Sequence, residues 1–156
     1  MVSLPRSELV EFLSPLLKQP CVLQVGALCY RHRKGALEIL LITSSSGNWI
    51  LPKGWPVKGL DGRDSALREA WEEAGVEAGK SERAPVFCVN TVKRFDSGAI
   101  VPCQLDIYKV KVTKLRDEYP EADRRKRVWV SPEKAIAMLA DPAVAKVVEQ
   151  FAQNDP

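Results

Sequence analysis

The segment from Gly54 to Val76 decides the fold, and it reads GWPVKGLDGRDSALREAWEEAGV. Its first half is rich in glycine, which favours a loop. Its second half predicts a helix that starts after Asp64 or Ser65 as the N-cap and runs to about Ala74, because Gly75 is a typical helix-ending residue. The sequence therefore predicts a glycine-rich loop that leads directly into a helix.

This predicted helix carries three clustered carboxylates. Glu69, Glu72 and Glu73 are spaced i, i+3 and i+4, so a helix places them on one face. Like charges crowded in this way destabilise a helix unless a cation lies among them. The spacing alone is common on solvated helix faces, but its combination with the glycines and Arg68 favours a metal site. A hard cation such as Mg²⁺ is the natural partner.

Such a segment suits chemistry at phosphates. A metal ion held by carboxylates neutralises phosphate charge and lowers the pKa of a bound water, and phosphoryl transfer depends mostly on positioning and charge stabilisation. Arg68 is expected to pair with a neighbouring glutamate and fix its rotamer. Gly54 and Gly59 allow the backbone to turn sharply and to approach the metal or the phosphate closely.

The composition is that of an ordinary globular protein. The chain has 156 residues, 46% hydrophobic and 28% charged, with a formal net charge of +3 that suits an anionic small molecule without requiring nucleic acid. Four cysteines without a Cys-x-x-Cys pair, and a single histidine, argue against a zinc site and favour buried free thiols. His32, in a charged turn, is expected at the surface. The absence of a signal-peptide pattern and of a long apolar run favours a cytoplasmic protein.

The rest of the chain alternates predicted strands and helices around the glycine-rich segment. An amphipathic helix is expected within residues 1–18, and two further helices start after Ser131 and Asp141, each with proline at its first position. Strands are expected over residues 21–30, 37–43, 49–51, 86–95, 100–112 and 128–130. The pattern predicts a mixed sheet with helices on its faces.

At this point a resemblance becomes clear. The segment resembles the Nudix box, Gly-x5-Glu-x7-Arg-Glu-U-x-Glu-Glu-x-Gly-U, where U is apolar, and residues 54–76 match it in register. One position departs, because Leu60 stands where the box has its first glutamate; Asp61 is adjacent and is a candidate to substitute for it. The Arg-Glu-U-x-Glu-Glu half from Arg68 to Glu73, which carries the chemistry in that family, is intact.

The resemblance implies an α/β fold: a single Nudix-like α/β/α sandwich domain over residues 1–156 with a mixed β-sheet and a loop–helix–loop catalytic motif. It implies Mg²⁺, with Mn²⁺ as a second possibility, and hydrolysis of a pyrophosphate bond. The implied catalytic residues are Arg68, Glu69, Glu72 and Glu73, and the implied metal ligands are Glu69, Glu73, Glu72 and Gly54. One of the glutamates, or a later carboxylate from Asp117, Glu118 or Glu121, would activate the water.

Flanking segments are similar to one branch of that family, the diphosphoinositol polyphosphate and diadenosine polyphosphate hydrolases. These segments are Leu41–Ser46, Trp49–Gly54 and Arg125–Ala135. A highly phosphorylated substrate agrees with basic and hydroxyl side chains that are expected to bind it: Lys53, Lys58, Ser45, Lys93, Arg94 and Arg125. Trp55 is the tryptophan expected to touch a ligand.

The leading hypothesis is therefore a Mg²⁺-dependent pyrophosphohydrolase that acts on diphosphoinositol polyphosphates or dinucleoside polyphosphates. Its expected partner is a phosphorylated small molecule, and neither a stable nucleic acid partner nor association with a membrane is expected. Within the same fold, an RNA 5′-pyrophosphohydrolase or a nucleotide-sugar hydrolase is the alternative. A catalytically weak Nudix-fold binding module is the alternative from another class, and Leu60 is its support.

Overall fold

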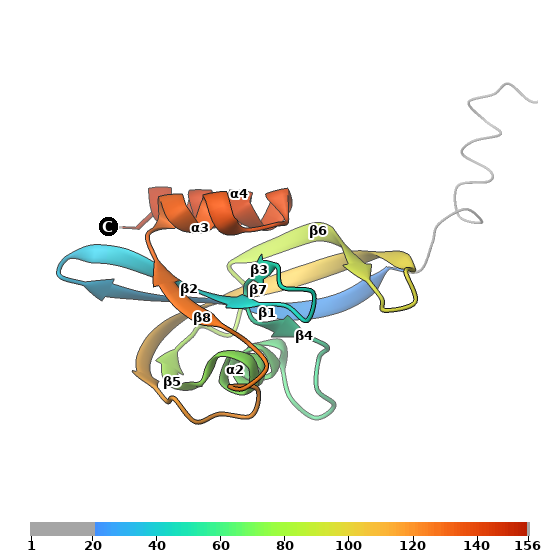
Figure 1. Ribbon diagram of the computed structural model, residues 1–156, viewed down its shortest axis with the longest axis horizontal. Coiled ribbons are helices and arrows are strands. Elements are labelled where there is room, and N and C mark those ends of the chain that lie inside the picture. Colours follow the sequence, from blue (N-terminus) through green and yellow to red (C-terminus); the bar gives the residue numbers. More distant parts are fainter. Residues whose placement is uncertain (1–20, 156) are drawn as a thin grey trace, which may run out of the picture.

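A computed structural model describes residues 21–155 of the chain (Figure 1). The helix expected within residues 1–18 lies outside the described residues.

The centre of the fold is a mixed sheet built around a long parallel pair. Strand β1 (Val22–Arg33) pairs antiparallel with β2 (Ala36–Thr43) and parallel with β7 (Ile100–Leu115). The main path through the sheet is β3-β2-β1-β7-β5, while β4 joins β1, β6 joins β7 and β8 joins β2. The remaining strands are β3 (Trp49–Ile50), β4 (Lys53–Gly54), β5 (Val76–Lys80), β6 (Phe87–Arg94) and β8 (Arg127–Val130).

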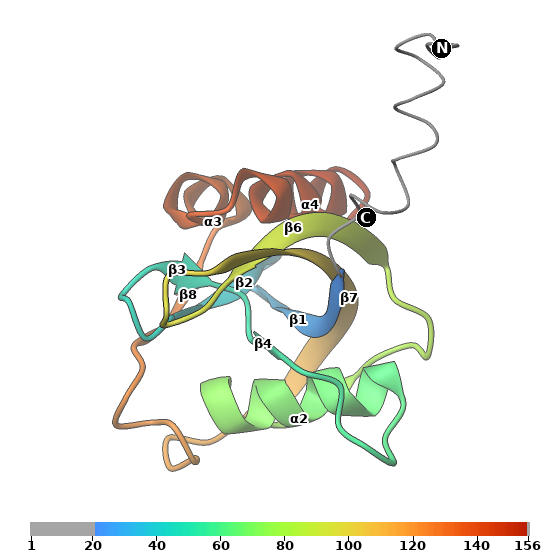
Figure 2. The same ribbon diagram turned by 90° about the vertical axis from the view of Figure 1, so that its right-hand side faces the viewer.

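Helices cover both faces of this sheet. Figure 2 shows α2 (Gly62–Ala74) on one side and α3 (Pro132–Met138) with α4 (Pro142–Gln153) on the other. The predicted α/β/α sandwich with a mixed sheet is therefore confirmed.

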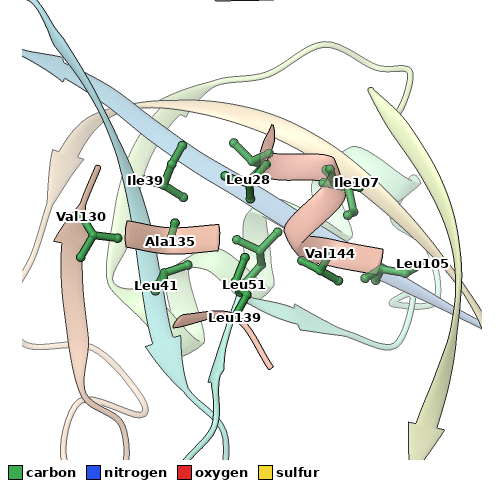
Figure 3. Close-up of a cluster of buried hydrophobic side chains, with 12 residues drawn as sticks. Leu28, Ile39, Leu41, Leu51, Leu105, Ile107, Val130, Ala135, Leu139 and Val144 are labelled. Carbon is green, nitrogen blue, oxygen red and sulfur yellow. The ribbon is translucent and has the colours of Figure 1, made fainter. Parts of the chain in front are cut away.

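The alternation of side chains along the central strands explains the two helical layers. Leu28, Ile39 and Leu41 pack on the face that α3 and α4 cover, as Figure 3 shows. Their chain neighbours, among them Leu40, pack on the opposite face with alanines of α2. Since successive strand residues point to opposite faces, a strand that is apolar at every position needs cover on both sides.

Local details at α2 differ from the sequence prediction in two ways. The N-cap is Asp61, whose side chain accepts a hydrogen bond from the Asp64 backbone N–H, so the prediction of Asp64 or Ser65 is wrong. The helix ends as predicted at Gly75, which has φ 72°. Directly after it, β5 was not predicted, because its short, mostly polar sequence shows no alternation.

The positions of the cysteines and of His32 agree with the sequence predictions in part. All four cysteines are free thiols; Cys29 and Cys103 are buried as expected, but Cys21 and Cys88 are exposed. His32 is exposed as predicted, and it hydrogen-bonds to Asp155. Among residues 21–155, no helix is both long enough and apolar enough to cross a bilayer.

Candidate active site

Strand β4 and helix α2 hold the two ends of the glycine-rich loop. Lys53 and Gly54 pair with β1, which fixes the start of the loop against the sheet. At the other end, the buried Ser65 hydroxyl accepts a hydrogen bond from the Val57 N–H at 3.0 Å. The loop is therefore tied down within a few residues of Gly54.

The loop forms one wall of a cleft of about 490 Å³, which we call the main cleft. Its lining combines acidic, basic and hydroxyl side chains from elements far apart in the sequence. The lining residues are Gln24, Ser44, Ser45, Ile50, Lys53, Gly54, Trp55, Pro56, Val57, Glu69, Glu73, Lys93, Glu121 and Arg125.

Glu73 is the most buried acid of the main cleft, with a side chain only 5% exposed. Its Oε1 accepts a hydrogen bond from the Lys53 backbone N–H at 2.9 Å, and its Oε2 lies 2.8 Å from the Arg125 guanidinium. Burial raises the pKa of Glu73 to about 7, against the opposing effect of Arg125. The pKa of this carboxyl group is thus close to physiological pH, where a side chain exchanges protons readily.

Glu69 lies one helical turn earlier and reaches the glycine-rich loop. Burial, followed by the charges of Glu72 and Glu121, raises the pKa of Glu69. A Cβ added to Gly54 would come within 2.4 Å of the Glu69 carboxyl carbon. The missing side chain of Gly54 thus makes room for the Glu69 carboxylate, whereas Gly59 supplies the predicted turn with a φ of 87°.

The third glutamate of α2 has a different environment. Glu72 accepts a hydrogen bond from Arg68 Nε at 3.1 Å, so the predicted pairing of Arg68 with a neighbouring glutamate is confirmed. Neither side chain lines the main cleft. Within the described residues, no three acidic, histidine or cysteine side chains are already arranged around a common point as ligands.

The structure separates the three later carboxylates that the sequence left open. Glu121 lines the main cleft, and its backbone N–H donates to the Glu72 carbonyl at 3.0 Å, which ties this loop to α2. Asp117 points outward, with a side chain 99% exposed and paired with Arg127. Glu118 is exposed and does not line the cleft.

Arg125 holds the acids of the cleft together. Its guanidinium contacts Glu73 at 2.8 Å and Glu121 at 3.2 Å, and its Nη1 donates to the Thr43 carbonyl at 2.8 Å. Because the side chain is only 16% exposed, its charge is mostly committed to these partners. In the structure, this residue therefore serves as the internal counter-ion of the two carboxylates, whereas the sequence predicted that it binds substrate.

The other residues expected to bind substrate are distributed unevenly. Lys53 and Lys93 line the main cleft, and burial, with the charge of Lys93 second, lowers the pKa of Lys53. Ser45 lies on the same wall. Arg94 lines only an adjoining cleft of about 340 Å³, which shares Ser44, Ser45, Ile50, Lys53 and Lys93 with the main cleft. Lys58 is exposed and lines neither cleft.

Sequence reasoning missed two features of the main cleft. Gln24 is buried within β1, and its Oε1 lies 3.3 Å from Lys53 Nζ; a single glutamine in an apolar strand was the available signal. Phe95, directly after β6, stacks near Trp55 with ring centroids 6.4 Å apart, and no local sequence pattern relates these two positions.

The donors in the main cleft fit a divalent cation. Glu69, Glu73 and Glu121 offer only oxygen atoms, the ligands that Mg²⁺ and Mn²⁺ prefer. Burial and the charges of neighbouring carboxylates raise the pKa values of Glu69 and Glu73, so a positive ion near them would relieve an existing electrostatic cost. Asp61, the possible substitute for the missing box glutamate, is instead occupied as the cap of α2.

Comparisons with known proteins agree with this arrangement. The model of the NUDIX domain matches residues 22–151. The chain is 29% identical over 134 residues to diphosphoinositol polyphosphate phosphohydrolase 3-beta of Homo sapiens, covering 82% of this chain and 76% of that protein. It is also 29% identical over 136 residues to the chloroplastic Nudix hydrolase 21 of Arabidopsis thaliana, covering 81% of this chain but only 64% of the plant protein's length.

Solved structures show the same fold. A C. elegans Ap4A hydrolase superimposes with a TM-score of 0.61 at 22% identity, covering 85% of this chain and 96% of that one. The E. coli dihydroneopterin triphosphate pyrophosphohydrolase gives a TM-score of 0.66 at 13% identity, covering 87% and 100%. The match of the family model over most of the chain, together with this fold, shows that the protein belongs to the Nudix hydrolase family.

Proposed function

We propose that this chain is a Mg²⁺-dependent pyrophosphohydrolase that cleaves a phosphoanhydride bond in dinucleoside polyphosphates or diphosphoinositol polyphosphates. The observation that carries the proposal is that one buried and two half-buried acids line a single cleft together with two lysines: Glu73, Glu69 and Glu121 with Lys53 and Lys93. The names of the human relative and of the C. elegans structure support the same two substrate classes.

The side chains in and beside the cleft have different roles. Lys53 and Lys93 bind the phosphate oxygens, for which a compact ammonium group is well suited. Glu69 and Glu73 would hold the divalent cation, which would neutralise phosphate charge and make water a better nucleophile. Arg68 fixes Glu72, which flanks these ligands on α2.

Glu121 is our choice for the carboxylate that accepts the proton of the attacking water. It is the one of the three later acids that lines the main cleft, and its backbone is bonded to α2. Its partner Arg125 keeps it in place and offers a positive charge to a phosphate once the acids bind a cation.

The test is hydrolysis of a substrate panel in the presence of Mg²⁺: a dinucleoside polyphosphate, a diphosphoinositol polyphosphate, a 5′-triphosphorylated RNA and a nucleotide sugar. Glu69→Gln and Glu121→Gln are expected to lower kcat by at least about 100-fold, while Glu118→Gln, an exposed acid in the same loop as Glu121, keeps the wild-type value. Cleavage of RNA or nucleotide sugars alone would refute the proposed substrate classes.

A catalytically weak binding module is the second candidate, and Leu60 favours it. Leu60 stands at the box position of a glutamate, is 40% exposed and does not line the main cleft. Tight binding of a polyphosphate without turnover, in the presence of Mg²⁺ or Mn²⁺, would support this candidate over the enzyme.

We also propose a cytoplasmic location. The free thiols, two of them buried, agree with a reducing compartment.

A further inference from the structure

Two large aromatic side chains are left exposed at the edge of the main cleft. Trp55 follows Gly54 in the loop and is 44% exposed, and Phe95 lies directly after β6 and is 38% exposed. Their rings are nearly parallel, with an interplanar angle of 26° and centroids 6.4 Å apart. Exposed aromatic faces beside a binding cleft indicate a ligand with a flat apolar part.

The position of the pair relates it directly to the phosphate-binding wall. Trp55 itself lines the main cleft, and Lys93 Nζ lies 5.8 Å from the centroid of the Phe95 ring. A ligand with its ring at Trp55 and Phe95 thus has its charged part next to Lys93 and Lys53, both of which line the cleft. This arrangement complements a molecule that joins an aromatic ring to a chain of phosphates.

The pair is held in place from both sides. The hydrogen bond from Val57 to the buried Ser65 fixes the loop that carries Trp55, and the turn that follows Phe95 is closed by a bond from the Phe95 N–H to the Ala99 carbonyl at 2.9 Å. Both side chains keep an exposed surface and lie nearly parallel, so a flat ring can stack on the aromatic surface that the pair presents. The rings are therefore prepositioned for stacking.

We propose that Trp55 and Phe95 form a nucleobase-binding site, and that the chain consequently prefers dinucleoside polyphosphates over diphosphoinositol polyphosphates. This inference rests on the proposed function, whose substrate class it narrows. An inositol ring carries only hydroxyl and phosphate substituents, so it has no π face to stack on these side chains. Stacking of one base on an aromatic side chain corresponds to about a ten-fold to hundred-fold gain in affinity.

The experiment measures equilibrium binding by calorimetry to three probes: diadenosine tetraphosphate, inositol hexakisphosphate and inorganic tripolyphosphate. Metal is chelated, so that no turnover occurs. Trp55→Ala and Phe95→Ala are expected to weaken binding of the dinucleotide about ten-fold to hundred-fold and to leave the other two probes within about two-fold. Trp55→Phe, which keeps an aromatic face, retains most of the affinity. Ile100→Ala removes a side chain that is 50% exposed on the same hairpin and lines neither cleft, so it changes nothing.

Unchanged dinucleotide binding in both alanine variants would overturn the inference, as would an equal loss for all three probes or no binding of the dinucleotide by the wild type. Equal melting temperatures of the variants and the wild type show that the losses come from lost contact with the ligand. If the base-dependent binding is found but no probe is hydrolysed after Mg²⁺ is added, the nucleobase site stands and the proposed enzymatic function fails.

Discussion

Replacing Gly54 with alanine tests whether the Glu69 carboxylate must lie directly against the glycine-rich loop. The new Cβ would be 2.4 Å from the Glu69 carboxyl carbon and 2.5 and 2.7 Å from its oxygens. Because carbon atoms in contact are normally about 3.5 Å apart, the carboxylate has to retreat by about 1 Å. A displacement of this size at a reacting centre lowers the rate about 100-fold.

The same substitution is expected to leave the fold nearly intact. Gly54 does not have a positive φ, so alanine is compatible with its backbone, and the cost is that of a shifted Glu69 rotamer, about 1 kcal/mol. Steady-state kinetics with Mg²⁺ and thermal unfolding separate the two effects. The expected result is a large fall in kcat with a small change in Tm.

Gly59→Ala is the matched control in the same loop. Gly59 has a φ of 87° and no atom within 4 Å of an added Cβ, so alanine strains the backbone without touching a carboxylate. It is expected to lower Tm while kcat stays near the wild-type value. Gly54→Ala combined with Glu69→Asp, which shortens the acid by one methylene, is expected to regain part of the lost rate. A Gly54→Ala variant with wild-type kcat would refute the role assigned to Glu69.

Three further predictions concern Glu73, its partner Arg125 and the bond that anchors the glycine-rich loop. Burial raises the pKa of Glu73 from 4.5 to about 7, so between these pH values the folded state keeps a proton that the unfolded state has lost. The metal-free wild type is therefore expected to lose roughly 2–3 kcal/mol of stability as pH rises from 4.5 to 7. Denaturant titrations at several pH values measure this loss, which is expected to be absent in Glu73→Gln. Arg125→Met leaves Glu73 buried without its cation and is expected to lower the free energy of unfolding by about 3 kcal/mol at pH 8. The loss is expected to be smaller at pH 5, where Glu73 is neutral. Equal losses of stability at both pH values would contradict the pairing. Ser65→Ala removes the acceptor for the Val57 N–H and is expected to lower the free energy of unfolding by about 1 kcal/mol. Because the loop is then less well positioned, KM is expected to rise more than kcat falls. An unchanged KM would show that this hydrogen bond does not position the loop.

The sequence was sufficient for the parts of the structure that depend on local patterns. The box helix with its end at Gly75, the helix caps Ser131 and Asp141, and the hairpin turn near Gly98 all follow from short-range propensities. The short strand β5 was missed because its pairing with β7, rather than its own composition, makes it a strand.

The arrangement of the charged side chains was harder to predict, because it depends on contacts between distant segments. Lys53 and Lys58 look equivalent in sequence, but only Lys53 lies in a strand that pairs with β1 and so reaches the cleft. Arg125 was expected to bind substrate, and no sequence pattern indicated that it would bond to the carbonyl of Thr43 and to Glu73. Among three similar acids, a single backbone bond to α2 distinguishes Glu121.

The parallel pairing of β1 with β7 has a consequence for how the chain folds. Residues 22–30 pair with residues 103–111, so this parallel pair forms only when the long segment between the two strands closes into a loop. That loop contains the glycine-rich segment, α2 and Lys93, while Glu121 and Arg125 come later in the chain. Closing so long a loop is entropically costly and makes folding slow relative to helix formation. On refolding from denaturant, we therefore expect the helical circular dichroism signal to return first and polyphosphate binding to be the last property regained.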